Sequence, residues 1–403
     1  LSPFSFLLSP FSFLLSLPFF PGFLISIDLV RMILSCNLKF SSSSGAICYG
    51  SHSNPPSPSY SPCKSSVRSP APTTTEPQPV LTSVKSFAPA TIANLGPGFD
   101  FLGCAVDGLG DHVTLRVDSR VPPGEVSISD IEGLGTFSNR LSRDPLWNCA
   151  GIAAMAAMRT LGIRSVGLSL SLEKGLPLGS GLGSSAASAA AAAVAVNEIF
   201  GKKLGASDLV AAGLESETKV SGHHADNIAP AILGGFVLIR SYDPLEVIPL
   251  PFPAEKKLHL VLVHPKFEAP TKKMRAALPK RVGMADHVWN CSQAAALVAA
   301  VLQGDARGLG RAMSSDRIVE PKRAPLIPGM EAVKRAAAEA GAFGCAISGA
   351  GPTAVAVAEE EGKGVKIGEA MMAAFKEEGK LTATALVRQL DRVGARVVSS
   401  TLR

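Results

Sequence analysis

The strongest pattern of hydrophobic and polar positions in this chain lies between residues 166 and 200. Apolar and polar residues alternate over 166–173, which predicts a strand. Residues 184–200 contain eight alanines and neither proline nor glycine, which predicts a helix. A loop with glycines at 179, 181 and 183 joins the two. The first turn of a helix has free N–H groups and the positive end of the helix dipole, so this order predicts an anion site, most commonly for phosphate.

Further strands and helices follow without a regular alternation of the two. We expect strands at 84–88, 111–117, 126–131, 235–240, 258–263, 342–348, 353–358 and 395–399. We expect helices at 145–161, 207–219, 228–233, 286–303, 329–340 and 363–379, with Asp144 as the N-cap of the first. Such a mixture favours the α+β class in two layers.

Length, charge and cysteine content narrow the class of protein. A chain of 403 residues suits two domains plus extensions, and the proline-rich segment 244–253 is the best candidate for their boundary. The net charge of +6 comes from scattered basic residues without a basic stripe, which argues against nucleic-acid binding. Seven cysteines without a C-x-x-C pair argue against a disulfide scaffold or a zinc module.

Residues 1–80 differ in composition from the rest of the chain. Asp28 and Glu76 are their only acids, and serine, proline and phenylalanine dominate. Residues 1–27 carry no charge, but four prolines argue against a membrane helix. From Met32 onward the segment is rich in serine and poor in acids, which resembles an organellar transit peptide. We therefore expect residues 1–80 to be a disordered leader, with translation starting at Met32.

The glycine loop could belong to one of several phosphate-binding types. A Walker A loop needs G-x-x-x-x-G-K-[ST], and Val196 stands where its first glycine would be. A dinucleotide fingerprint needs G-x-G-x-x-G, and Ser184 replaces its third glycine. From the residues alone, a tight turn before a close-packed alanine helix also stays open.

The loop reads P-x-G-x-G-L-G-S-S-A from Pro177 to Ala186, which resembles the nucleotide-binding motif of the GHMP kinases. The resemblance implies ATP and Mg²⁺ as cofactors. The nucleotide-binding residues would be Pro177, Gly179, Ser180, Gly181, Leu182, Gly183, Ser184 and Ser185. Kinases hold Mg²⁺ through one or two carboxylates plus phosphate oxygens. By resemblance Glu217 is that carboxylate and Ser185 adds a hydroxyl to the same ion.

A second glycine-rich turn, NLGPGFD, covers residues 94–100. Asn94 and Asp100 are common turn formers, so a purely structural role stays open. The longer stretch PATIANLGPGFD resembles the first motif of the homoserine kinase branch of the GHMP kinases. Mevalonate and galactose relatives instead begin this stretch with APG and then carry Lys or Arg. By resemblance Asn94 and Asp100 bind the polar and cationic end of a substrate.

The segment ESETKVSGHHADN at 215–227 contains the remaining acid–base candidates. The family pattern has a histidine directly before ADN, which selects His224 for the acceptor pocket and leaves His223 at the surface. Asp226 is the candidate for a catalytic base. Asn227 beside it is also a catalytic candidate, because it leaves the alignment of this motif ambiguous.

Two arginines are candidates for binding a carboxylate, which arginine can grip with two hydrogen bonds. Arg275 shares one helical face with Thr271, and Arg323 lies between prolines. Surface ion pairs would be the ordinary alternative for both. By resemblance these residues, together with Gly349 in the third motif FGCAISGAGPT at 343–353, bind the substrate.

The complete set of motifs resembles homoserine kinases over residues 84–403. The resemblance implies a ribosomal-protein-S5-domain-2-like, ATP-binding domain at 81–250 and a ferredoxin-like domain at 251–403. The implied reaction is ATP + L-homoserine giving ADP + O-phospho-L-homoserine, in the plastid stroma. We expect a homodimer without nucleic-acid or membrane partners. A GHMP kinase for another small alcohol and a non-catalytic GHMP-fold binding protein remain as alternatives.

Overall fold

A computed structural model of the protein describes residues 76–133, 140–220 and 222–402. The leader up to residue 75, including the expected start at Met32, lies outside the described residues. The folded part was predicted to begin at residue 81, but residues before 81 already contact the rest of the fold. Glu76 Oε1 accepts hydrogen bonds from Arg164 N at 2.9 Å and Ser165 N at 2.8 Å. Residues 76–80 therefore belong to the folded part.

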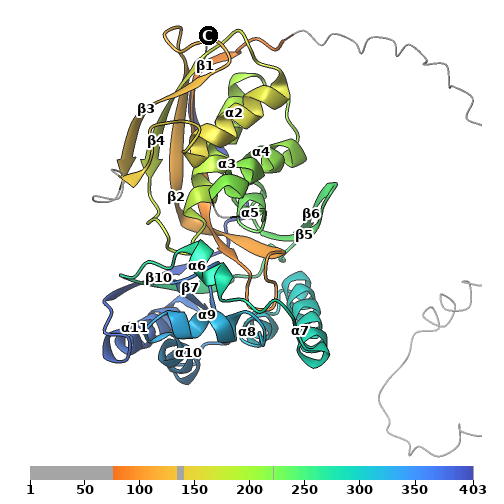
Figure 1. The fold of residues 1–403 in the computed structure, drawn as a ribbon. Helices are drawn as coiled ribbons and strands as arrows, with labels where there is room; N and C mark the ends of the chain where they lie inside the picture. The colour runs from red at the N-terminus through yellow and green to blue at the C-terminus, as the bar shows by residue number, and fades with distance from the viewer. Residues whose placement is uncertain (1–75, 134–139, 221, 403) are drawn as a thin grey trace, which may run out of the picture. The chain divides into compact units, whose positions relative to one another are not determined.

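The first part of the fold is a seven-stranded sheet with helices packed on one side (Figure 1). The strand order is β11-β1-β2-β4-β3, and β5 pairs with both β2 and β6. The strands are β1 (Leu81–Ala93), β2 (Leu102–Val117), β3 (Val126–Gly133), β4 (Leu168–Lys174), β5 (Phe236–Tyr242), β6 (Leu245–Leu250) and β11 (Arg396–Leu402). The helices are α2 (Cys149–Leu161), α3 (Ser184–Ile199), α4 (Ala206–Val220) and α5 (Ile228–Leu233).

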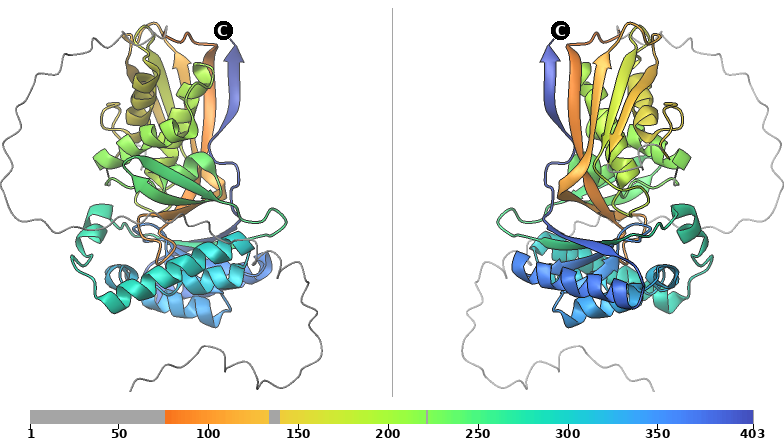
Figure 2. Two further views of the ribbon diagram at one scale, coloured as in Figure 1. Left: turned by 90° about the vertical axis from the view of Figure 1, so that its right-hand side faces the viewer. Right: turned by 90° about the vertical axis from the view of Figure 1, so that its left-hand side faces the viewer.

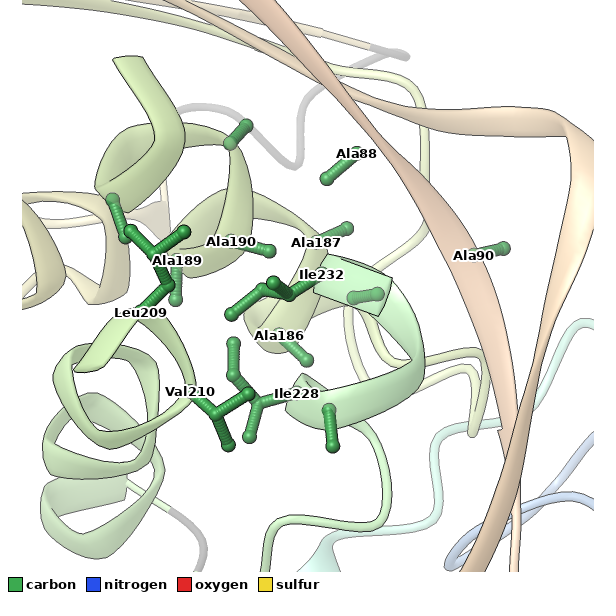
Figure 3. Close-up of a cluster of buried hydrophobic side chains, with 14 of the residues drawn as sticks. Ala88, Ala90, Ala186, Ala187, Ala189, Ala190, Leu209, Val210, Ile228 and Ile232 are labelled. Atoms are coloured by element: carbon green, nitrogen blue, oxygen red, sulfur yellow. The ribbon is translucent and has the colours of Figure 1, made fainter. Parts of the chain in front are cut away.

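The alanine run forms α3, and fourteen of its sixteen residues are buried. A helix that is apolar on every side has to be enclosed by other elements. Small side chains on α3 and on β1 let the helix approach the sheet closely (Figure 3). The helices α2, α4 and α5 pack on its other sides. The labelled residues of this cluster are Ala88, Ala90, Ala186, Ala187, Ala189, Ala190, Leu209, Val210, Ile228 and Ile232. This packing anchors the glycine loop that leads into α3.

The second part is a four-stranded antiparallel sheet in the order β10-β7-β9-β8, with α10 and α11 packed on it (Figures 1 and 2). Its strands are β7 (His259–Pro265), β8 (Gly344–Ile347), β9 (Ala354–Ala358) and β10 (Ala383–Arg388). Its helices are α6 (Thr271–Ala276), α7 (Met284–Gln303), α8 (Ala306–Met313), α9 (Glu320–Arg323), α10 (Met330–Glu339) and α11 (Glu361–Glu377), with a short 3-10 turn η2 (Ala324–Leu326). β11 then returns to pair with β1 in the first sheet, which the predicted division at residue 250 did not include.

The start of α2 differs from the prediction. The helix begins at Cys149 and not at residue 145, because Asn148 is its N-cap and accepts a hydrogen bond from Ala150 N at 3.0 Å. Asp144 instead accepts from Leu146 N at 2.9 Å and holds a turn of its own. The cap prediction was wrong because the side chains of Asp144 and Asn148 can both accept a hydrogen bond from a backbone N–H group.

Other elements were too short or missing in the prediction. β1 was expected over 84–88 only, but it continues to Ala93. Its pairing with β2 shifts register between Pro89 and Ala90, which accommodates a proline that lacks an N–H group. β6, β10 and α8 were not predicted. β6 lies within the proline-rich segment 244–253, whose composition concealed its pairing with β5.

Candidate active site

A cavity of about 470 Å³ lies where the glycine loop, the 94–101 turn, the 222–227 loop, α6 and the second glycine loop meet. Most of the predicted site residues line it. These are Asn94, Asp100, Gly179, Ser180, Gly181, Gly183, Ser184, Ser185, Glu217, His224, Asp226, Asn227, Thr271, Arg275, Arg323 and Gly349. Pro177 and Leu182 do not line it. Leu182 is buried, and its carbonyl accepts a hydrogen bond from Thr91 N at 3.1 Å.

The glycine loop has a shape that side chains would disturb. Gly181 has φ +79°, and a Cβ there would lie 2.8 Å from Gly351 O and closer still to Ser348 O. Gly183 has φ +65°, and a Cβ there would collide with Thr91 Oγ1. Gly183 is also the N-cap of α3, and it provides no side-chain acceptor for the first N–H groups of the helix. The loop is therefore a backbone cradle that can accept an anion.

The second part of the fold holds this cradle through hydroxyl groups. Ser348 Oγ donates to Gly181 O at 2.6 Å, and Thr353 Oγ1 donates to Ser180 O at 2.6 Å. His264 Nδ1 lies 3.0 Å from Thr353 Oγ1. The threonine proton is already given to Ser180, so His264 must donate at Nδ1. Burial lowers the pKa of His264, which favours the neutral ring.

A buried ion pair lies directly beneath the loop. Lys174 is the last residue of β4, and its Nζ forms an ion pair with Asp111 and donates to Ser184 O at 2.7 Å. Asp111 Oδ1 also accepts from Gly175 N at 3.0 Å and Leu176 N at 3.2 Å. The pair thus connects β2, the start of the loop and the first turn of α3. Neither residue was predicted.

In another part of the cavity wall the 94–101 turn is held in a strained conformation. Asn94 and Asp100 have φ values of 72° and 65°, in the left-handed region. Asn94 Oδ1 accepts from Asp100 N at 3.1 Å, and its Nδ2 donates to Gly349 O at 2.7 Å. Arg275 makes two hydrogen bonds to the Asp100 carboxylate, at 2.9 and 2.5 Å. Two of the predicted substrate residues therefore pair with each other.

Arg323 is the more deeply buried of the two arginines, with 2% of its surface exposed. Its Nη1 donates to Gly349 O at 2.8 Å. Burial and the neighbouring charge of Arg275 lower the pKa of Arg323 to about 10. Phe99 lies against both guanidinium groups. This ring was not singled out in the sequence, where it is one apolar residue within the turn motif.

The two adjacent histidines separate as predicted. His223 is exposed, whereas His224 is buried and its Nδ1 lies 3.1 Å from Asp226 Oδ1. Burial lowers the pKa of His224, but the hydrogen bond and charge of Asp226, together with the charge of Glu217, outweigh it and raise the pKa overall. Tyr242 Oη accepts from Ala225 N at 2.9 Å and so fixes this loop.

The remaining candidates line the same cavity. Asn227 Oδ1 accepts from Thr91 Oγ1 at 2.8 Å, so this side chain holds the wall beside Gly183. Glu217 on α4 is 2% exposed and lines the cavity with Ser185 of α3. Within the described ranges, no group of three His, Cys, Asp or Glu side chains could hold a metal ion alone.

Comparison with known proteins connects this site to a family. Residues 148–235 match the model of the GHMP kinases N terminal domain, and residues 297–377 match that of the GHMP kinases C terminal. The chain is 68% identical over 373 residues to a homoserine kinase of Arabidopsis thaliana, which covers 91% of this chain and 100% of that protein. The chain belongs to the homoserine kinase family of GHMP kinases. The predicted two-domain GHMP kinase fold and the predicted kinase class are thereby confirmed.

Two solved structures agree with this assignment. The crystal structure of homoserine kinase from Cytophaga hutchinsonii superposes with a TM-score of 0.73 at 42% identity, covering 80% of this chain and 99% of that one. L. major mevalonate kinase, solved in complex with R-mevalonate, superposes with a TM-score of 0.61 at 18% identity, covering 78% and 99%. The second likeness concerns the fold alone. In the part of the chain that the structure describes, no helix has the length and apolar character needed to cross a membrane.

Proposed function

We propose that the protein transfers the γ-phosphate of ATP to the hydroxyl group of L-homoserine, giving O-phospho-L-homoserine. One observation carries the proposal. A single cavity is lined by a backbone anion cradle, here called its phosphate end, and by a group of opposite charges, Asp100, Arg275 and Arg323, here called its acceptor end. An amino acid with a free ammonium and carboxylate matches the second end. The family to which the chain belongs supports the same reaction.

The phosphate end fits ATP and Mg²⁺ by its donor set. The loop 179–185 and the uncapped start of α3 supply backbone N–H groups for phosphate oxygens. Glu217 and Ser185 supply one carboxylate and one hydroxyl, so phosphate oxygens would complete the coordination of a metal. Bound Mg²⁺ would neutralise charge on the transferred phosphate. We propose that these residues lie in an ATP-binding domain at 81–250, extended by residues 76–80 and by β11, and joined to a second domain that begins at 251.

At the acceptor end we propose distinct roles for the charged groups. Asp100 would take the ammonium of the substrate, because its partner Arg275 would bind the carboxylate of the same substrate molecule. Arg323 and Arg275 would take the carboxylate. His224 and Thr271 would complete the pocket around the part of the substrate that carries the hydroxyl group. Asn94 and Gly349 would act by holding the turn, because their polar groups already bond to each other.

Phosphoryl transfer mostly requires positioning and charge neutralisation, so a strong base is not obligatory. Asp226 is the candidate for receiving the hydroxyl proton. The residue is 2% exposed and lines the cavity, and its carboxylate bonds to His224. His224 would orient that carboxylate. Asn227 would contribute by fixing the wall beside the glycine loop rather than by contact with the reacting atoms.

We further propose a plastid location. The serine-rich, acid-poor composition of 32–80 and the Arabidopsis relative support it.

We also propose a homodimer, because α7 is apolar on two opposite sides. Leu297 and Val301 are fully buried, whereas Met284, Val288 and Leu302 are 74%, 59% and 46% exposed. We expect light scattering to give twice the chain mass for the wild type and a single chain mass for Val288→Asp.

ADP release by the full chain with MgATP tests the reaction. The acceptor panel is homoserine, serine, threonine, mevalonate and galactose. We expect turnover with homoserine and none with mevalonate or galactose. Turnover with another alcohol alone would keep the nucleotide site but overturn the roles of Arg275 and Arg323. ATP binding without any turnover would favour the binding-protein alternative.

A further inference from the structure

Phe99 brings two positive charges of the acceptor end against one aromatic ring. The Cζ atom of Arg275 lies 5.3 Å from the ring centroid, and that of Arg323 lies 5.0 Å from it. Both distances are within the range of cation–π attraction. Two guanidinium groups this close to one centre repel each other. The electron-rich faces of the ring can offset that repulsion where little water reaches.

Hydrogen bonds alone restrain these arginines incompletely. Arg275 is held through Nη1 and Nη2, which both donate to Asp100. Arg323 donates one hydrogen bond among the described residues, from Nη1 to Gly349 O. The Nε atoms of both arginines are buried and have no hydrogen-bond partner among the described residues. One hydrogen bond leaves the guanidinium plane of Arg323 free to rotate. Contact with the ring supplies the missing restraint.

The surroundings of Phe99 are those of a site residue and not of a core residue. The ring is only half-buried and lines the cavity. Among the described residues it belongs to neither of the two hydrophobic clusters, whereas Phe101, two positions later, packs against the first of them. Phe99 also directly precedes Asp100, whose left-handed backbone fixes the direction of the turn. The chain thus holds an aromatic ring in the cavity at a cost in backbone conformation.

We propose that Phe99 is a positioning residue for the acceptor. Its ring holds the guanidinium groups of Arg275 and Arg323 at the separation that receives the substrate carboxylate. This inference rests on the proposed function, because it presumes an acceptor with a carboxylate. The ring explains why the like charges of Arg275 and Arg323 stay together when no substrate carboxylate is bound between them.

The test compares variants that keep or remove the aromatic ring. For Phe99→Leu we expect the KM for homoserine to rise about tenfold, the sum of two cation–π contacts in a partly dry site. We expect kcat and the KM for ATP to stay within about twofold, since neither depends on these arginines. Phe99→Tyr and Phe99→Trp should restore the KM for homoserine to within about threefold, because both keep a π face.

Phe101→Leu is the matched control. It removes the same atoms two residues away, so it should lower the melting temperature without changing the KM for homoserine. Replacement of Phe99 by singly, doubly and triply fluorinated phenylalanine weakens the ring charge at nearly constant shape. The KM for homoserine should rise in that order while the melting temperature stays constant. This series also serves if Phe99→Leu does not fold.

Three results would overturn the inference. One is an unchanged homoserine KM in a folded Phe99→Leu enzyme. Another is an equal rise of both KM values, which would mean that the ring only supports the fold. The third is a flat response to fluorination. If the wild type does not phosphorylate homoserine at all, the proposed function fails instead, and the two failures are distinguishable.

Discussion

At the glycine-loop end of the cavity, the groups available to a ligand are backbone amides and hydroxyls, whereas at the 94–101 end they are charged side chains. The backbone end is fixed by contacts that leave no space for a Cβ, as at Gly181. The side-chain end is fixed by ion pairs and hydrogen bonds, such as Asp100 with Arg275. The first should therefore respond to added atoms and the second to lost charge. The following experiments test this contrast, from the largest expected effect to the smallest.

Lys174→Met should have the largest effect, because it leaves the buried carboxylate of Asp111 without its cation. We expect the free energy of unfolding to fall by about 3–5 kcal/mol. Lys85→Met is the matched control, since Lys85 pairs with Glu173, the neighbour of Lys174, and both its side chain and that of Glu173 are about one-third exposed. That variant should lose about 1 kcal/mol or less. Equal losses in chemical denaturation would show that the buried pair does not support the loop.

Asp226→Asn tests whether the side-chain end supplies a proton acceptor. We expect kcat to fall about 100-fold, within the usual range for general base catalysis, with little change in either KM. The asparagine keeps the size of the side chain and a hydrogen bond to His224. Steady-state kinetics and a melting curve separate chemistry from folding. An unaltered kcat would remove Asp226 from the reaction.

Gly181→Ala adds one methyl group to the backbone end. Its Cβ would meet two carbonyl oxygens of the second glycine loop. Beyond the strain of the positive φ, we therefore expect a further cost of about 1–3 kcal/mol in unfolding free energy and a higher KM for ATP. Gly179→Ala is the matched control, because it shares a positive φ of +63° and has nothing within 4 Å. Its free energy of unfolding should fall only by the backbone strain that the alanine introduces, about 1–2 kcal/mol. The contrast fails if both variants bind ATP equally well.

Arg275→Ala removes charge from the acceptor end. We expect the KM for homoserine to rise about tenfold to a hundredfold, the usual range for hydrogen bonds to charged groups, while the KM for ATP barely moves. Lys273→Ala is the control on the same helix, since Lys273 is exposed. Equal changes in both KM values would mean that the arginine has a structural role.

His224→Gln should have the smallest effect on the free energy of unfolding, and the test lies in how that effect changes with pH. The pKa of His224 is raised in the folded protein, so its charged form contributes stability below the unfolded pKa and loses that contribution as pH rises through the folded pKa. The substitution should therefore cost more unfolding free energy near pH 5.5 than near pH 8.5. His223→Gln, at the exposed neighbour, should show no such difference. A larger cost at the higher pH would contradict the assigned direction.

Local pattern predicted those parts of the molecule whose contacts lie close in sequence. The alternation before residue 174 and the alanine run after Gly183 specify β4 and α3, because a strand has period 2 and a helix of small residues has high propensity. The resemblance of the motifs to those of the GHMP kinases likewise located sixteen of the residues that line the cavity. The helix cap at Asn148 escaped, because Asp144 offers the same kind of acceptor four residues earlier.

By itself, then, the sequence determined the glycine loop, the main elements and the family of motifs. Only the tertiary structure decided that Asp100 pairs with Arg275, which is 175 residues away, and that Lys174 meets Asp111, which is 63 residues away. It also decided that Phe99 lies against two arginines. Such contacts join distant segments and leave no periodic trace in the chain. They arise when β2, β4 and the second sheet pack together, because a charge that is removed from water needs an opposite charge or polar groups beside it.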